Sequence, residues 1–138
     1  MVMLLHDRFE SSTMRAHRKR LATLLLSRGE LKQADDQVLI FFETIGLLVH
    51  KRVLYSDMVW NEFCWEVVRY WEALTTPVNQ ISRLREAAKD KTLYCEFEEM
   101  NERLLRIDCK RRGVGLDVAR PNRTEINEFL NDEGKLDV

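Results

Sequence analysis

The sequence predicts an all-α fold, a single five-helix, bundle-like domain that spans residues 1–113. In five segments apolar residues recur at intervals of three and four, which is the period of an amphipathic helix. Outside these segments no sustained alternation of apolar and polar residues occurs, as it would in a half-buried strand. The chain has 138 residues, of which 45% are hydrophobic, and can therefore bury a core without disulfides or a metal.

Two consecutive patterns between Val38 and Leu74 define the centre of this fold. The first runs to about His50 and carries on one face Val38, Phe41, Phe42, Ile45, Leu48 and Val49. The second begins at Ser56, a residue type that caps helices, and carries Val59, Trp60, Phe63, Cys64, Val67, Val68, Tyr70, Trp71 and Leu74. Each pattern is apolar over about half of the helix surface, so both helices should pack in the core.

The helices on either side of this centre have weaker signals. Ser11 and Ser12 can cap a first helix that ends at Gly29. Pro77 follows the third helix and lacks an amide donor, so we expect a kink or a very tight corner between helices three and four. The alternative is a new helix with Thr76 as its cap and Pro77 in its first turn.

The fifth helix is followed by a polar C-terminal segment. The fourth helix extends to about Lys89, Asp90 can open the fifth, and Gly113 can terminate it. Residues 114–138 are polar and have only a weak helical pattern, from Thr124 to Leu130. We expect this segment to be a loosely held tail.

Charge and cysteine content indicate a cytoplasmic protein. The net charge of −1 gives no overall attraction to nucleic acids or to anionic membranes. The three cysteines, Cys64, Cys95 and Cys109, are odd in number and have no C-x-x-C spacing, which disfavours both a disulfide framework and a zinc site. The apolar run Met1–Leu5 ends at His6, so the sequence predicts neither a signal peptide nor a membrane span.

The second predicted helix contains two residues that are unusual in a helical core. A buried Glu43 needs a cation or several hydrogen-bond donors, and Arg85 is the expected partner because its helix places it among apolar residues. Glu98 is the second acid that Arg85 could pair with, and we interpret the pair as structural. Gly46 costs a helix about 1 kcal/mol relative to alanine, so another backbone or a large ring, such as Trp71, should pack against it.

Catalytic and metal-binding motifs are absent from the sequence. The histidines His6, His17 and His50 are dispersed, without the spacings of a di-iron or zincin site. No G-x-S-x-G turn and no glycine-rich phosphate loop occurs, and Cys64 lies on an apolar face, where thiols are usually inert. The sequence therefore predicts a non-enzymatic protein without metal or cofactor; an enzyme built around Glu43 is the third hypothesis.

A short basic run in the first predicted helix is the best candidate for nucleic-acid binding. Arg15, Arg18 and Lys19 share one arc and could follow phosphates, whereas Arg20 points away from them. No glycine turn and recognition helix follow this run, so a solvated helix face is the favoured interpretation. A nucleic-acid-associated regulator is the second hypothesis, although binding should be weak.

Met58 and Trp65 stand out because they project from the otherwise polar half of the third helix. A tryptophan beside a methionine on such a face is typical of a contact anchor, and Arg69, one turn further on, could lie over the indole. Packing against the first helix is the alternative. The first hypothesis for function is therefore a protein-interaction domain that binds another protein, or a second copy, through Met58, Trp65 and Arg69.

Several short blocks resemble a bacterial all-helical family known as domain of unknown function 4760. They are Phe41–Val49, Val59-Trp60, Arg69–Trp71, Leu93-Tyr94 and Phe97-Glu98, together with Met14-Arg15 in the first helix and Leu84-Arg85 before the fifth. The resemblance covers roughly residues 12–107 and leaves the tail outside. It implies a helical fold and supplies no activity, substrate or catalytic residue.

Overall fold

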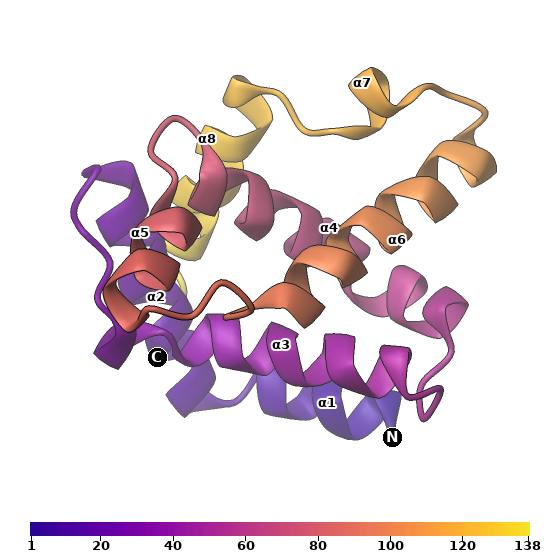
Figure 1. The fold of residues 1–138 in the computed structure, drawn as a ribbon, viewed down its shortest axis with the longest axis horizontal. Coiled ribbons are helices and arrows are strands. Elements are labelled where there is room, and N and C mark those ends of the chain that lie inside the picture. Colours follow the sequence, from indigo (N-terminus) through magenta and orange to yellow (C-terminus); the bar gives the residue numbers. More distant parts are fainter.

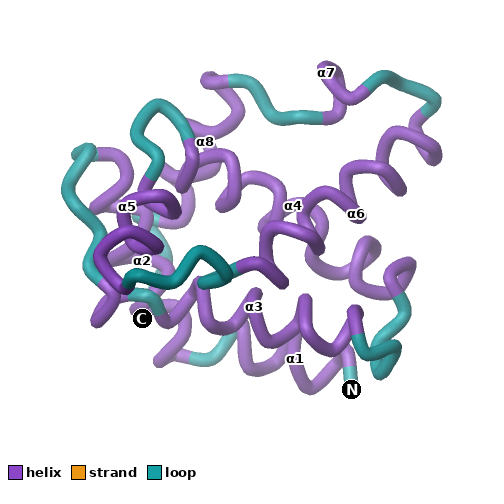
Figure 2. The backbone as a smooth tube through the Cα atoms, viewed as in Figure 1, coloured by secondary structure: helices purple, strands orange, loops and turns teal.

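Helices joined by loops make up the entire structure, a computed structural model that describes residues 1–138 (Figures 1 and 2). The helices are α1 Val2–Phe9, α2 Ser12–Leu26, α3 Gln37–His50, α4 Ser56–Thr75, α5 Gln80–Ala88, α6 Cys95–Arg112, α7 Leu116–Ala119 and α8 Arg123–Glu133. The all-α prediction is confirmed. The prediction of five helices is wrong, because seven helices have eight residues or more and α7 adds a four-residue turn. None of them combines the length and apolar character that crossing a bilayer requires.

The sequence pattern misses α1, whose buried face consists of Val2 and Phe9 alone. Two apolar positions one helix length apart give no recognisable period. Phe9 is nevertheless central to the core, because its ring lies 5.2 Å from that of Phe41, 5.6 Å from Phe42 and 5.8 Å from Phe63. The Phe9 ring thus anchors the C-terminal end of α1 in the core, and Val2 anchors its N-terminal end.

Helices α3, α4 and α6 form the middle of the fold, and α6 has the most extensive contacts with the other two (Figure 1). The close approach predicted at Gly46 is confirmed: a Cβ atom there would lie 2.7 Å from the carbonyl carbon of Glu96, at the start of α6. The neighbour is backbone rather than the ring of Trp71. That ring packs instead on Phe97, with centroids 5.0 Å apart.

A corner at Pro77 separates α4 from α5. Helix α4 ends at Thr75, the peptide bond from Thr76 to Pro77 is cis, and α5 begins only at Gln80. The side chain of Asn79 accepts a hydrogen bond from the amide of Ser82 at 2.9 Å and so caps α5. A single kinked helix is therefore wrong, and so is Thr76 as the cap.

Other predicted boundaries shift by a few residues. Ser56 is the first residue of α4, and its cap position is held by Tyr55. A turn follows Asp90, so α6 begins at Cys95. Gly113 ends α6 in the left-handed conformation at φ 66°, as predicted.

The C-terminal segment 114–138 is part of the core rather than a loosely held tail. A capping box starts α8, in which Asn122 accepts from the amide of Glu125 and the Glu125 side chain accepts from the amide of Asn122. Ile126, Phe129 and Leu130 of this helix are buried. The Phe129 ring packs edge-on against Tyr70 at 4.9 Å. The prediction failed because three apolar residues at helical spacing indicate a short helix but do not show that it packs in the core.

Helix α8 is held against α2 by a buried ion pair. Arg18 is 4% exposed, and its guanidinium donates to both carboxylate oxygens of Glu133, at 2.9 and 2.8 Å. It also donates to the carbonyl oxygen of Phe9 at 3.1 Å, and the Tyr70 hydroxyl donates to Glu133 at 2.6 Å. Four elements of the chain therefore meet at one buried carboxylate and its cation.

Candidate interaction site

Helix α4 presents two large apolar side chains to solvent on the side opposite its core face. Its core face buries Val59, Phe63 and Tyr70. Met58 is 50% exposed and Trp65 is 60% exposed. Both project from the polar half of the helix, where the sequence pattern places them, and Trp65 is not buried by another helix.

The indole of Trp65 is fixed by Arg69. The guanidinium carbon lies 3.3 Å from the ring centroid, in the cation–π arrangement that the spacing suggests. One nitrogen of this guanidinium donates to the carbonyl oxygen of Trp65 at 3.4 Å, and another lies 3.2 Å from the carboxylate of Glu125 on α8. Burial lowers the pKa of Arg69, and the Glu125 charge opposes that effect. The ring is thus exposed but pre-organised.

A groove of about 460 Å³ opens beside this stacked pair. Helix α4 forms one wall, and α6, α7 and the start of α8 form the rest. Its lining residues are Trp60, Asn61, Cys64, Trp65, Val68, Arg69, Asp108, Arg112, Ala119 and Glu125. A second tryptophan in this lining, Trp60, is also covered by an arginine, with the Arg111 guanidinium 4.4 Å from the ring centroid.

The charges in the walls of the groove neutralise one another. Arg69 pairs with Glu125, and Arg112 lies 2.9 Å from Asp108 one turn before it on α6. No lining charge is left without an opposite charge nearby. The groove can therefore accept an apolar or aromatic side chain of a partner without leaving an uncompensated ion in the contact.

Cys64 contributes packing rather than reactivity to this groove. Burial raises the pKa of its thiol to about 12, and the Asp108 carboxylate adds to the shift. The thiol therefore stays protonated at neutral pH, and a protonated thiol is a poor nucleophile. This agrees with its interpretation as an inert residue of the apolar face.

A family model described as Domain of unknown function (DUF4760) matches residues 3–104, about three quarters of the chain. The chain belongs to this family. No curated protein and no solved structure matches it. The DUF4760 match includes all of α4, with Met58, Trp65 and Arg69, whereas the groove residues Asp108 and Glu125 lie beyond its end.

Within the DUF4760 residues, the ion pair expected between Glu43 and Arg85 does not form. Arg85 instead donates to Glu98 at 2.8 Å, the second candidate, and to the carbonyl oxygen of Leu93 at 2.7 Å. Glu43 accepts from the amide of Phe97 at 2.7 Å. This amide lies in the first turn of α6, where N–H groups lack intrahelical partners. Glu43 therefore needs no arginine, although burial raises its pKa.

The basic arc proposed for phosphate contacts is broken in the structure. Arg18 is buried against Glu133 and cannot face a phosphate. Arg15 lies 3.6 Å from the carboxylate of Glu10, and Lys19 remains exposed. The wheel of α2 shows that these residues share a side, but it cannot show that α8 covers part of that side.

The structure also brings together three possible metal ligands that the sequence does not suggest. His50 at the end of α3 lies 2.9 Å from the carboxylate of Glu96, and Glu99 is close enough for the three donor atoms to lie within 4.8 Å of one another. These are the side chains that could hold a divalent cation. They were missed because His50 and Glu96 are 46 residues apart.

Sequence reasoning also missed the far wall of the groove. Ala119 and Glu125 belong to the segment expected to be a loose tail. The usable signal was the spacing from Asn122 to Glu125, which matches a capping box and marks the start of a helix. The capping box strengthens the weak helical pattern from Thr124 to Leu130 and places the start of that helix just after Pro121.

Proposed function

We propose that this chain is a non-enzymatic protein-interaction domain that docks its partner on the exposed face of α4, with Trp65 as the anchor. The observation that supports the proposal is an exposed indole held in one orientation by Arg69 and Glu125. Tryptophan and arginine are the residue types most often found at energetic centres of interfaces. Because the ring is already ordered, little side-chain entropy is lost on binding.

The groove beside Trp65 supports the same proposal. Its charges are paired within the chain, so a partner is not required to supply a matching ion. Met58, seven residues before Trp65, extends the apolar surface along α4 with a flexible side chain that adapts to different contacts. A second copy of the chain, related by a two-fold axis, is the first partner to test.

The two alternative functions have less support. A nucleic-acid regulator would use Arg15 and Lys19 without Arg18, which is buried. An enzyme around Glu43 would use a carboxylate that already accepts the Phe97 amide. We also propose a cytoplasmic location, since the three cysteines are free and one of them, Cys95, is exposed.

The test compares the parent with Trp65→Ala and with Leu47→Ala, a matched loss of an exposed apolar side chain on α3. Mass in solution is measured over a concentration series by light scattering. We expect the parent and Leu47→Ala to form dimers of similar affinity. The dissociation constant of the Trp65→Ala dimer should be at least about tenfold higher. A parent that stays monomeric rejects the second copy as partner.

A different protein as partner is tested by capture with the same three chains. A specific partner should be retained by the parent and by Leu47→Ala and lost with Trp65→Ala. If every protein captured by the parent is captured equally by Trp65→Ala, the α4 face is not an interaction site.

A further inference from the structure

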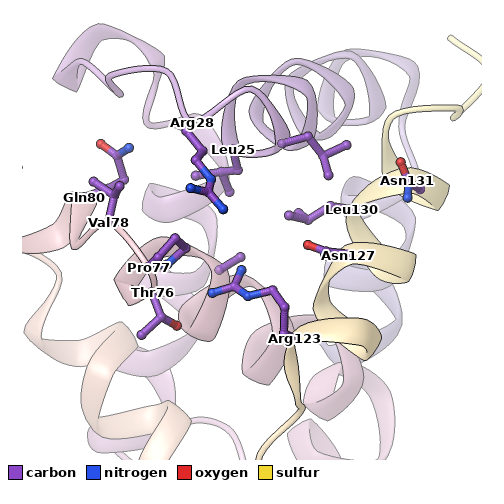
Figure 3. A pocket seen from close by; sticks show the side chains of 12 residues that line it. Leu25, Arg28, Thr76, Pro77, Val78, Gln80, Arg123, Asn127, Leu130 and Asn131 are labelled. Atoms are coloured by element: carbon purple, nitrogen blue, oxygen red, sulfur yellow. The ribbon is translucent and has the colours of Figure 1, made fainter.

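A second cavity, of about 270 Å³, lies where three segments of the chain end or turn. The end of α2, the corner between α4 and α5, and the exposed side of α8 contribute its walls (Figure 3). Its volume is slightly below the roughly 300–1,000 Å³ of pockets that hold drug-sized molecules. A ligand for this cavity is therefore small.

Two arginines enter this cavity from different walls. Figure 3 shows the guanidinium groups of Arg28, just after α2, and Arg123, at the start of α8, extending toward the same space. Neither group pairs with an acid, unlike the arginines of the groove and the core, and no acidic residue lines the cavity. Two like charges that share a cavity repel each other, so a bound anion would relieve an unfavourable arrangement.

Neutral hydrogen-bonding groups accompany the two cations. Asn127 and Asn131, one turn apart on α8, line the cavity, and their amide groups have no partner within the protein. Guanidinium and amide groups together are suited to the several oxygens of a phosphate or a carboxylate.

The wall that carries Arg28 is held in place by Gln80. The buried Gln80 amide donates to the carbonyl oxygen of Gly29 at 2.8 Å and accepts from the amide of Leu31 at 3.1 Å. Both contacts fix the loop directly after Arg28. The backbone next to Arg28 is thus held in place, while the Arg28 guanidinium remains free to bind a ligand.

Apart from Thr76 and Gln80, the rest of the lining is apolar. Leu25, Ala73, Val78 and Leu130 face the cavity beside the polar groups. From these observations we infer that the cavity binds a small organic anion, with an oxyanion head group between Arg28 and Arg123 and a short apolar body against these four side chains. Phosphate and carboxylate heads share this chemistry.

Calorimetric titration of the full chain with phenyl phosphate, benzoate and the neutral benzyl alcohol tests the inference. Both anions, or one of them, should bind, and benzyl alcohol should not; the tighter anion identifies the head group. In Arg28→Gln and in Arg123→Gln the affinity should fall about tenfold or more. Arg106→Gln, which removes an exposed arginine from α6 far from the cavity, should bind as the parent does.

Absence of binding by both anions up to about 10 mM overturns the inference. So does equal affinity in the parent, Arg28→Gln and Arg123→Gln. Both arginines are exposed, so their variants should keep the helical circular dichroism of the parent, which checks folding independently. Trp65→Ala should bind the anion normally, so this site and the proposed interaction face fail or succeed separately.

Discussion

The contact of α3 with α6 and the contact of α2 with α8 are packed in opposite ways. At the first, Gly46 removes a side chain so that the backbone of Glu96 can approach. At the second, Arg18 is buried deeply and compensated by Glu133. The first contact therefore tolerates no added atom, whereas the second tolerates no lost charge.

The largest expected effect is at the charged contact. Arg18→Ala leaves the Glu133 carboxylate buried without its cation, and breaking a buried pair in this way typically costs about 3–5 kcal/mol. The free energy of unfolding, measured with urea, should fall by about that amount. Arg85→Ala is the control, because its pair with Glu98 is partly exposed and should contribute about 1 kcal/mol or less. Equal losses in the two variants would contradict the contrast.

The close-packed contact is tested by Gly46→Ala. The added Cβ atom meets the backbone of Glu96, so the helices must separate, at a cost of about 1–3 kcal/mol despite the better helix propensity of alanine. Gly29→Ala is the control, since a Cβ there meets its nearest atom at 3.4 Å, an ordinary contact. The same urea measurement applies. A Gly46→Ala variant as stable as the parent would show that the approach is looser than described.

The smallest effect concerns Glu66, beside the Arg18 pair. Burial raises the pKa of Glu66, and the Glu133 and Glu10 carboxylates raise it further, while one of its oxygens has no hydrogen-bond partner. The Glu66 carboxyl group thus binds its proton more tightly in the folded chain than in the unfolded chain. Stability should therefore fall as the pH rises from the ordinary pKa of 4.5 through the raised one.

Glu66→Gln removes that dependence. We expect the variant to match the parent below about pH 4 and to be more stable than the parent at neutral pH. Glu86→Gln, an exposed change on α5, is the control. Unfolding curves at both pH values decide the question, and a variant less stable than the parent at neutral pH would mean that the Glu66 charge is favourable.

The sequence pattern predicted those parts of the fold that depend on residues within a single helix. The helices around Val38–Leu74, the end of α6 at Gly113 and the close approach at Gly46 all follow from local residue types. The stacking of Arg69 on Trp65 was also predictable from the sequence, because residues four apart on a helix are neighbours.

Contacts between distant segments could not be predicted in this way. A helical wheel shows that Arg18 and Glu43 lie on a particular side, but not which segment covers that side. Arg18 meets a carboxylate 115 residues later, and Glu43 meets an amide 54 residues later. The groove and the anion cavity depend on α8 in the same way, because the weak helical pattern from Thr124 to Leu130 does not show against which segments that helix packs.

The separation of Arg18 from Glu133 has a consequence for the order in which the chain acquires its structure during synthesis. At roughly 5–20 residues per second, a ribosome adds the intervening 115 residues in roughly 6–23 s. Throughout that interval the nascent helices α1 to α6 can gather, but the Arg18 guanidinium has no Glu133 to accept from it. Arrival of α8 is then the step that closes the core, and a ribosome paused before it would hold a chain open to proteases and chaperones.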